Sequence, residues 1–198
     1  MEQLIQTLSW IATALQVPVV VAILYLLVRG LIALGAFYEH WSDRQRRQRR
    51  MAADSDESLT ANIDDLATAL TAGRRPDALQ RAAAALQKQP ADTAWHERVI
   101  TEFELQTDRQ LSLYRTMTRI GPLLGLMGTL IPLGPALVGL ASGDISLLAR
   151  KMEVAFATTV VGLVIGAIGY LLHQAANRWA LDDLSLLEYF SSKLRGAK

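Results

Sequence analysis

The chain contains no cysteine, which excludes disulfide bonds and any metal site built on thiolates. Its three histidines, His40, His96 and His173, lie far apart with no ligand spacing around them, so we expect neither a metal ion nor another cofactor. The net charge is only +1, which creates no overall field of the kind that attracts nucleic acid. The sequence also lacks a nucleophile–base pair and a phosphate-binding loop, and we therefore expect it not to be an enzyme.

Charge is missing from two long apolar runs. Residues 120–141 and 154–172 carry no charged side chain, and a third run, 17–38, is interrupted only by Arg29. A helix of about 20 apolar residues crosses the hydrocarbon core of a bilayer. Three such runs disfavour the alternative of buried core helices in a soluble protein. We therefore expect an all-α membrane protein with transmembrane helices at 17–41, 119–141 and 150–173.

A basic cluster directly after the first run predicts the orientation of the chain. It comprises Arg44, Arg46, Arg47, Arg49 and Arg50. Lys and Arg beside a span mark its cytoplasmic end, so we expect the N-terminus outside and the C-terminus in the cytoplasm. Topology and anionic membrane lipid explain this cluster better than nucleic acid does, because it adjoins a span.

The segments between and beyond the spans have helical patterns. Asp54 with Glu57 resembles a capping pair that opens a helix through about Ala72. A second helix stops before Pro90, and a third begins near Thr93 and continues into the second span. These helices make up a cytoplasmic section over residues 42–118.

The remaining segments complete the expected layout. Residues 142–149 form a short outer loop, and residues 174–198 repeat apolar side chains at helical spacing, which predicts a cytoplasmic C-terminal helix. Residues 1–16 also follow the helical period, which is typical of a short interfacial helix. An alternative remains open, in which they form the outer end of the first span.

The second and third spans each present a narrow row of small residues that includes a hydroxyl group. Thr129 shares a helix face with Gly125 in the second span, and Thr159 shares one with Gly162 and Gly166 in the third. Such rows let membrane helices approach closely, and packing alone would account for them. We expect helix contacts at Gly121, Gly125, Gly128, Gly162 and Gly166.

Two segments resemble the signature helices of the MotA/TolQ/ExbB proton channel family. Residues 122–129 are Pro-Leu-Leu-Gly-Leu-Met-Gly-Thr, where the family's second helix commonly has P-L-L-G-L-x-G-T. Residues 155–163 are Ala-Phe-Ala-Thr-Thr-Val-Val-Gly-Leu, where its third helix commonly has A-x-x-T-T/A-x-x-G-L. The size resembles ExbB and TolQ, whereas the Thr158–Thr159 pair resembles MotA.

This resemblance implies a homopentamer in a bacterial or archaeal inner membrane, with a pore lined by the second and third helices. Thr129, Thr159 and Thr158 would line that pore. A single-span partner of the MotB/TolR/ExbD type, in two copies, would stand inside it and carry an intramembrane Asp. The chain would then be the pore-forming stator subunit of a motor driven by the proton motive force. A non-conducting oligomeric membrane scaffold is the alternative.

The spans contain no Asp or Glu at depth, which favours a carboxylate supplied by a partner. Threonine hydroxyls donate and accept hydrogen bonds but do not titrate usefully. ExbB and TolQ relatives commonly have a Glu five residues before the third-helix Thr, whereas here Glu153 precedes Thr158 by five residues and Thr159 by six. Glu153 is either that ion-path carboxylate in a shifted register or, as we favour, an outer-interface residue beside Arg150 and Lys151.

Overall fold

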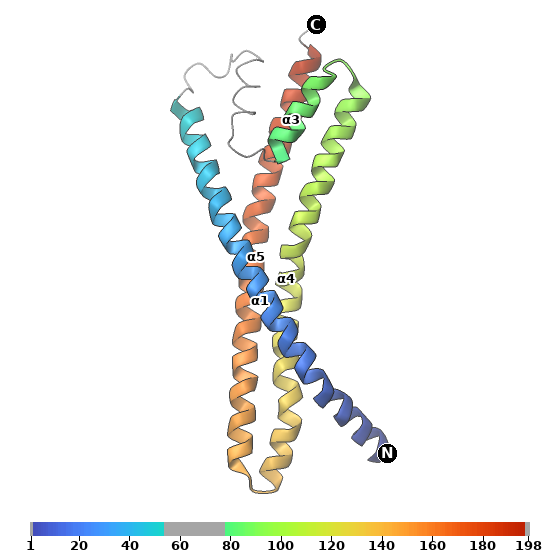
Figure 1. Ribbon diagram of the computed structural model, residues 1–198, viewed down its shortest axis with the longest axis vertical. Coiled ribbons are helices and arrows are strands. Elements are labelled where there is room, and N and C mark those ends of the chain that lie inside the picture. The colour runs from blue at the N-terminus through green and yellow to red at the C-terminus, as the bar shows by residue number, and fades with distance from the viewer. Residues whose placement is uncertain (1, 54–77, 197–198) are drawn as a thin grey trace. The chain divides into compact units, whose positions relative to one another are not determined.

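The computed structural model describes residues 2–53 and 78–196, and these residues form helices and short connections without any strand. The helices are α1 (Glu2–Ala53), α3 (Ala78–Lys88), α4 (Thr93–Ala141) and α5 (Ile145–Gly196), as labelled in Figure 1. The all-helical fold agrees with the expected class. The helix expected from Asp54 to about Ala72 lies outside the described residues.

Three of these helices are long and apolar enough to cross a membrane, as the sequence predicted. They are α1, α4 and α5, and the apolar segment of α1 is Thr13–Glu39. α4 runs unbroken from Thr93 into the second apolar run, and α5 continues far beyond the third. α1 is also continuous from Glu2, so residues preceding the first apolar run belong to the same helix as the run itself.

The described residues divide into two compact units. The first, called here the span unit, takes the residues up to Tyr38 together with Leu113–His173. The second, called the polar unit, takes the other described residues of α1, α4 and α5 and the whole of α3. The apolar runs lie in the span unit and most of the charged side chains lie in the polar unit.

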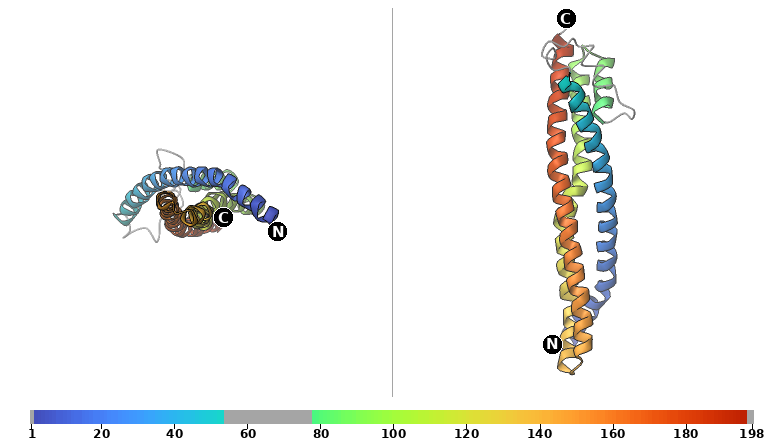
Figure 2. Two further views of the ribbon diagram at one scale, coloured as in Figure 1. Left: turned by 90° about the horizontal axis from the view of Figure 1, so that it is seen from below. Right: turned by 90° about the vertical axis from the view of Figure 1, so that its left-hand side faces the viewer.

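In the span unit, α1 packs against both other helices. Val19, Ile23 and Leu26 of α1 are buried together with Met117 of α4 and Ile165 of α5. The end-on view in Figure 2 shows that α1 lies on one side of the α4–α5 pair. The opposite side of the pair therefore has no cover from α1.

A three-residue turn at positions 142–144 joins α4 to α5. Gly143 has a φ of 80°, a left-handed conformation that glycine adopts without steric cost. The Leu147 backbone N–H donates to the Asp144 carboxylate at 2.9 Å, which caps the start of α5. Because of this cap, residues 145–149, which were expected in the outer loop, form the first turns of α5.

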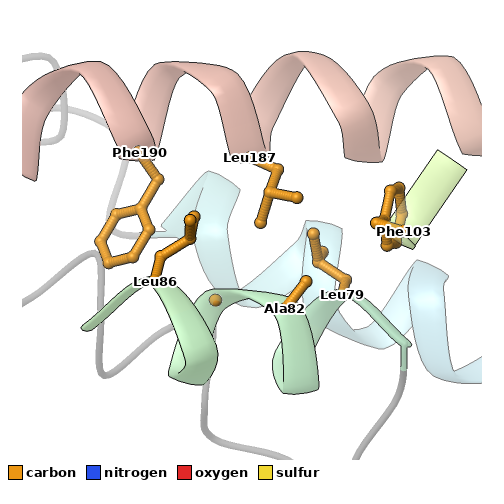
Figure 3. Packing of buried hydrophobic residues seen from close by; sticks show 7 residues of the cluster. Leu79, Ala82, Leu86, Phe103, Leu187 and Phe190 are labelled. Carbon is orange, nitrogen blue, oxygen red and sulfur yellow. The ribbon is translucent and has the colours of Figure 1, made fainter. Parts of the chain in front are cut away.

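The polar unit has its own apolar core, built on one face of α3. Leu79, Ala82 and Leu86 point toward Leu187 and Phe190 of α5, as Figure 3 shows. Leu86 and both α5 residues have no exposed surface. Complete burial of a leucine or phenylalanine contributes roughly 1.5–3 kcal/mol, so this cluster ties the short α3 to the longer helices.

A buried histidine adds a polar link in the same unit. His96 of α4 is 1% exposed, and its Nδ1 lies 2.7 Å from the Ser191 hydroxyl of α5. Its Nε2 lies 3.2 Å from the Gln89 carbonyl oxygen. Because a carbonyl only accepts, Nε2 of neutral His96 carries the hydrogen and Nδ1 accepts from the Ser191 hydroxyl.

An arginine joins α1 to α5 in the polar unit. The Arg44 guanidinium donates to Asp183 at 2.8 Å and to Asp182 at 3.3 Å. Its central carbon also lies 5.6 Å from the centre of the Trp179 ring, within the range of a cation–π contact. Thus one cation of the predicted basic cluster is neutralised inside the chain.

Candidate functional site

The site begins with a close contact between the backbones of α4 and α5. A methyl group added at Gly162 would lie 2.7 Å from both the Gly121 carbonyl oxygen and the Gly125 Cα atom. Neither atom belongs to a flexible side chain, so only glycine fits here without a shift of the helices. Contact this close leaves no room for water between the two helices at this level.

The contact extends in both directions along the helices. A methyl group at Gly128 would lie 2.5 Å from Thr158 Oγ1, and one at Gly166 would lie 2.8 Å from Pro122 Cγ. Gly169, which the sequence analysis did not single out, lies against α4 as well. The i+3 spacing of Gly169 from Gly166 was the available signal. We call this row of contacts the seam.

All three predicted pore threonines donate a hydrogen bond to a backbone carbonyl oxygen. Thr129 donates to Leu126 at 2.7 Å, and Thr158 donates to Ala155 at 2.9 Å. Thr159 lies 3.1 Å from the Ala155 carbonyl oxygen and 3.4 Å from that of Gly125 across the seam. Because each hydroxyl hydrogen has a backbone acceptor, the oxygen lone pairs are what these side chains offer to another molecule.

Helical geometry shows on which side of the seam each threonine lies. Ile165 of α5 and Leu124 of α4 both pack against the α1 cluster. At about 100° per residue, Thr159 lies about 120° from Ile165, with Gly162 between them. Thr129 likewise lies about 140° from Leu124. Thr129 and Thr159 therefore share the side of the pair that α1 does not cover, called here the uncovered flank.

The structure does not bring the other two candidates to this flank. Thr158 is only about 20° from Ile165 around α5, on the α1 side of the seam. Its contact with Gly128 indicates a packing role. Glu153 is exposed and lies about 180° from Gly162, pointing away from α4.

The uncovered flank is apolar apart from its hydroxyl groups. Leu126 and Leu163 lie on it and are more than half exposed, at 54% and 56%. The stretches Ile120–Ala141 and Val154–Leu172 contain no charged residue. The flank can orient water or a carboxyl group through its threonines, but no side chain of these stretches can hold a proton in transit. Within residues 2–53 and 78–196, no three His, Asp or Glu side chains lie close enough to hold a metal ion.

Three apolar helices, two of them joined by a glycine seam, define a multi-pass helical membrane protein. Residues 75–188 match the model of the MotA/TolQ/ExbB proton channel family, and the chain belongs to this family. This match confirms the resemblance found in the two signature helices. No curated protein and no solved structure matches the chain. The family is one of proton channels, not of enzymes, and its members work with a partner of the MotB/TolR/ExbD type.

Proposed function

We propose that this chain is the pore-forming stator subunit of a complex driven by the proton motive force, and that its uncovered flank lines the ion path. The observation that carries this proposal is the position of Thr129 and Thr159. They lie on the same flank, away from α1, in stretches of helix without any Asp or Glu. Such a wall guides a proton-carrying group that another molecule supplies.

The chemistry of the wall fits a partner carboxyl group. Threonine oxygens whose hydrogens are already donated to the backbone accept hydrogen bonds from water or from a protonated carboxyl group. An Asp on a single-span partner of the MotB/TolR/ExbD type, in two copies, supplies the group that takes up and releases the proton. One proton that crosses a potential of 100 mV delivers about 2.3 kcal/mol, which biases one step of partner movement.

The uncovered flank of one copy of the chain lines only one side of the ion path, so the path requires several copies around the partner. The large exposed side chains of the uncovered flank support this assembly, and we propose five copies, the number that the family resemblance implies. The arginines that follow the first span favour an inner-membrane orientation with the N-terminus outside and the C-terminus in the cytoplasm. Glu153 then belongs to the outer interface beside Arg150 and Lys151.

The test is proton flux through the complex of this chain with its single-span partner, reconstituted in vesicles that contain a pH-sensitive dye. Thr159→Val should lower the flux about threefold to tenfold, the range expected for one lost hydrogen bond. Thr159→Ser should restore most of the flux, because it keeps the hydroxyl group.

Thr158→Val is the matched control, since it makes the same change one residue away on the α1 side of the seam. Its flux should stay near that of the unchanged complex. Equal losses for both valine variants would contradict the assignment of the uncovered flank. A complex that assembles normally but carries no partner-dependent flux would instead favour the scaffold function.

A further inference from the structure

We propose that Thr118 and Tyr170 form a second pair of hydroxyl groups on the uncovered flank, which holds water where the ion path leaves the apolar part of the span unit. This inference rests on the proposed function, because it assigns a place in the same path. We call Thr129 with Thr159 the outer tier, and Thr118 with Tyr170 the inner tier. The sequence analysis singled out neither residue of the inner tier.

The first observation is the spacing along the two helices. Thr118 lies eleven residues before Thr129 on α4, and Tyr170 lies eleven residues after Thr159 on α5. Eleven residues make three helical turns to within about 20°, a rise of about 16 Å. Each residue of the inner tier therefore lies almost directly in line with a residue of the outer tier.

The second observation is that α4 and α5 run antiparallel, which brings the two inner residues to one level. A methyl group at Gly169 would lie 2.8 Å from the Thr118 nitrogen, so Thr118 is opposite the neighbour of Tyr170. At the outer tier, the Gly125 carbonyl oxygen lies 3.4 Å from Thr159 Oγ1. Each tier thus combines one hydroxyl group from α4 with one from α5.

The third observation is that the inner tier lies on the same flank as the outer tier. Thr118 is about 120° around α4 from Leu124, and Tyr170 is about 140° around α5 from Ile165. Both reference residues pack against the α1 cluster, so the inner tier faces away from α1. Tyr170 is 56% exposed, which leaves its ring open to a molecule outside the chain.

The two inner side chains have complementary hydrogen-bonding capacity. Thr118 Oγ1 donates to the Tyr114 carbonyl oxygen at 2.9 Å, so its remaining capacity is to accept. A phenol hydroxyl both donates and accepts. Together the two groups can hold a water molecule that accepts a proton and passes it on.

The position of the inner tier along the proposed path indicates its role. Residues 121–128 of α4 and 160–169 of α5, which lie between the tiers, have only apolar side chains, such as Leu126 and Leu163 on the flank, and these bind no water. Arg119, directly after Thr118, is exposed and marks the end of the charge-free stretch of α4. The inner tier therefore stands where a proton released by the partner carboxyl group first meets water.

The absence of cysteine allows a direct test of hydration in the membrane-embedded complex with its partner. Thr118→Cys and Tyr170→Cys should react with a charged, membrane-impermeant methanethiosulfonate. Leu171→Cys is the control, because it is exposed at the same level but lies on another side of α5. The inner-tier variants should react at least about tenfold faster, since a wet site favours the reactive thiolate and one pKa unit is a tenfold change. Rates equal to that of Leu171→Cys would overturn the inference.

Proton flux provides the second readout. Thr118→Val and Tyr170→Phe should each lower the flux about threefold to tenfold through the loss of one hydrogen bond. Thr118→Ser should keep most of the flux, because it keeps the hydroxyl group. Tyr170→Trp should lower the flux as Tyr170→Phe does. If Tyr170 only anchored the helix at the membrane interface, tryptophan would replace it without a loss of flux. Unchanged flux in both variants, with a loss in Thr159→Val, would overturn the inner tier and leave the proposed function intact. If Thr159→Val also had no effect, the proposed function would be wrong. The rates at which Thr118→Cys and Tyr170→Cys react would then decide whether water reaches the inner tier.

Discussion

Gly162→Ala adds a single methyl group at the seam between α4 and α5. The new carbon would lie 2.7 Å from the Gly121 carbonyl oxygen and from Gly125 Cα. Non-bonded carbon atoms prefer a separation of about 3.5–4.0 Å, so the two helices must move apart by about 1 Å at this level. Overpacking of this kind costs about 1–3 kcal/mol, because the neighbours of the displaced backbone lose their contacts as well.

The measurement is the thermal midpoint of the purified protein in detergent. It is obtained from the decrease of the monodisperse peak in size-exclusion chromatography after heating to a series of temperatures. For a chain of this size, each 1 kcal/mol lowers the midpoint by about 2–4 °C. The midpoint of Gly162→Ala should therefore fall by about 2–12 °C. An equilibrium titration with a denaturing detergent should give a matching loss in the free energy of unfolding.

Gly134→Ala is the matched control for this experiment. Gly134 also lies in the α4 span, but a methyl group there has nothing within 4 Å. Its midpoint should not fall, since the change removes a flexible residue without a clash. If the two alanine variants had the same midpoint, the seam would not be the tight backbone contact described above, and the reasoning would be refuted.

Two further predictions concern the polar unit. His96→Phe leaves the buried Ser191 hydroxyl without its acceptor, which should destabilise the α3 region by about 1–3 kcal/mol in amide hydrogen exchange. Adding Ser191→Ala should recover most of that loss, and a larger loss in the double variant would contradict the assigned hydrogen bond. Arg44→Ala should lower exchange protection around position 44 of α1 by about 1 kcal/mol, because an ion pair and a cation–π contact are lost together. The loss should be smaller in high salt. Arg44→Lys should keep only part of the protection, and full protection with lysine would show that the geometry of the guanidinium group does not matter.

The helical elements were predictable because each depends on local pattern. The apolar runs are long enough to span a membrane, and a continuous helix from Thr93 followed from the absence of any breaker before Pro122. The start of α5 was placed five residues late, because the Asp144 cap is a contact between a side chain and the backbone that hydropathy does not register. The hydrogen bond between His96 and Ser191 could not be predicted from local pattern either, since the two residues are 95 positions apart.

The sequence by itself determined that this chain is a helical membrane protein of the proton channel family, with its small residues and hydroxyl groups in two particular spans. It determined this because hydrophobic length and short motifs are properties of single helices. Only the tertiary structure decided that Thr129 and Thr159 share a flank while Thr158 turns toward α1. The reason is physical: the face that a helix exposes depends on which other helix covers it, and here that cover is α1, which packs against α4 and α5 from one side.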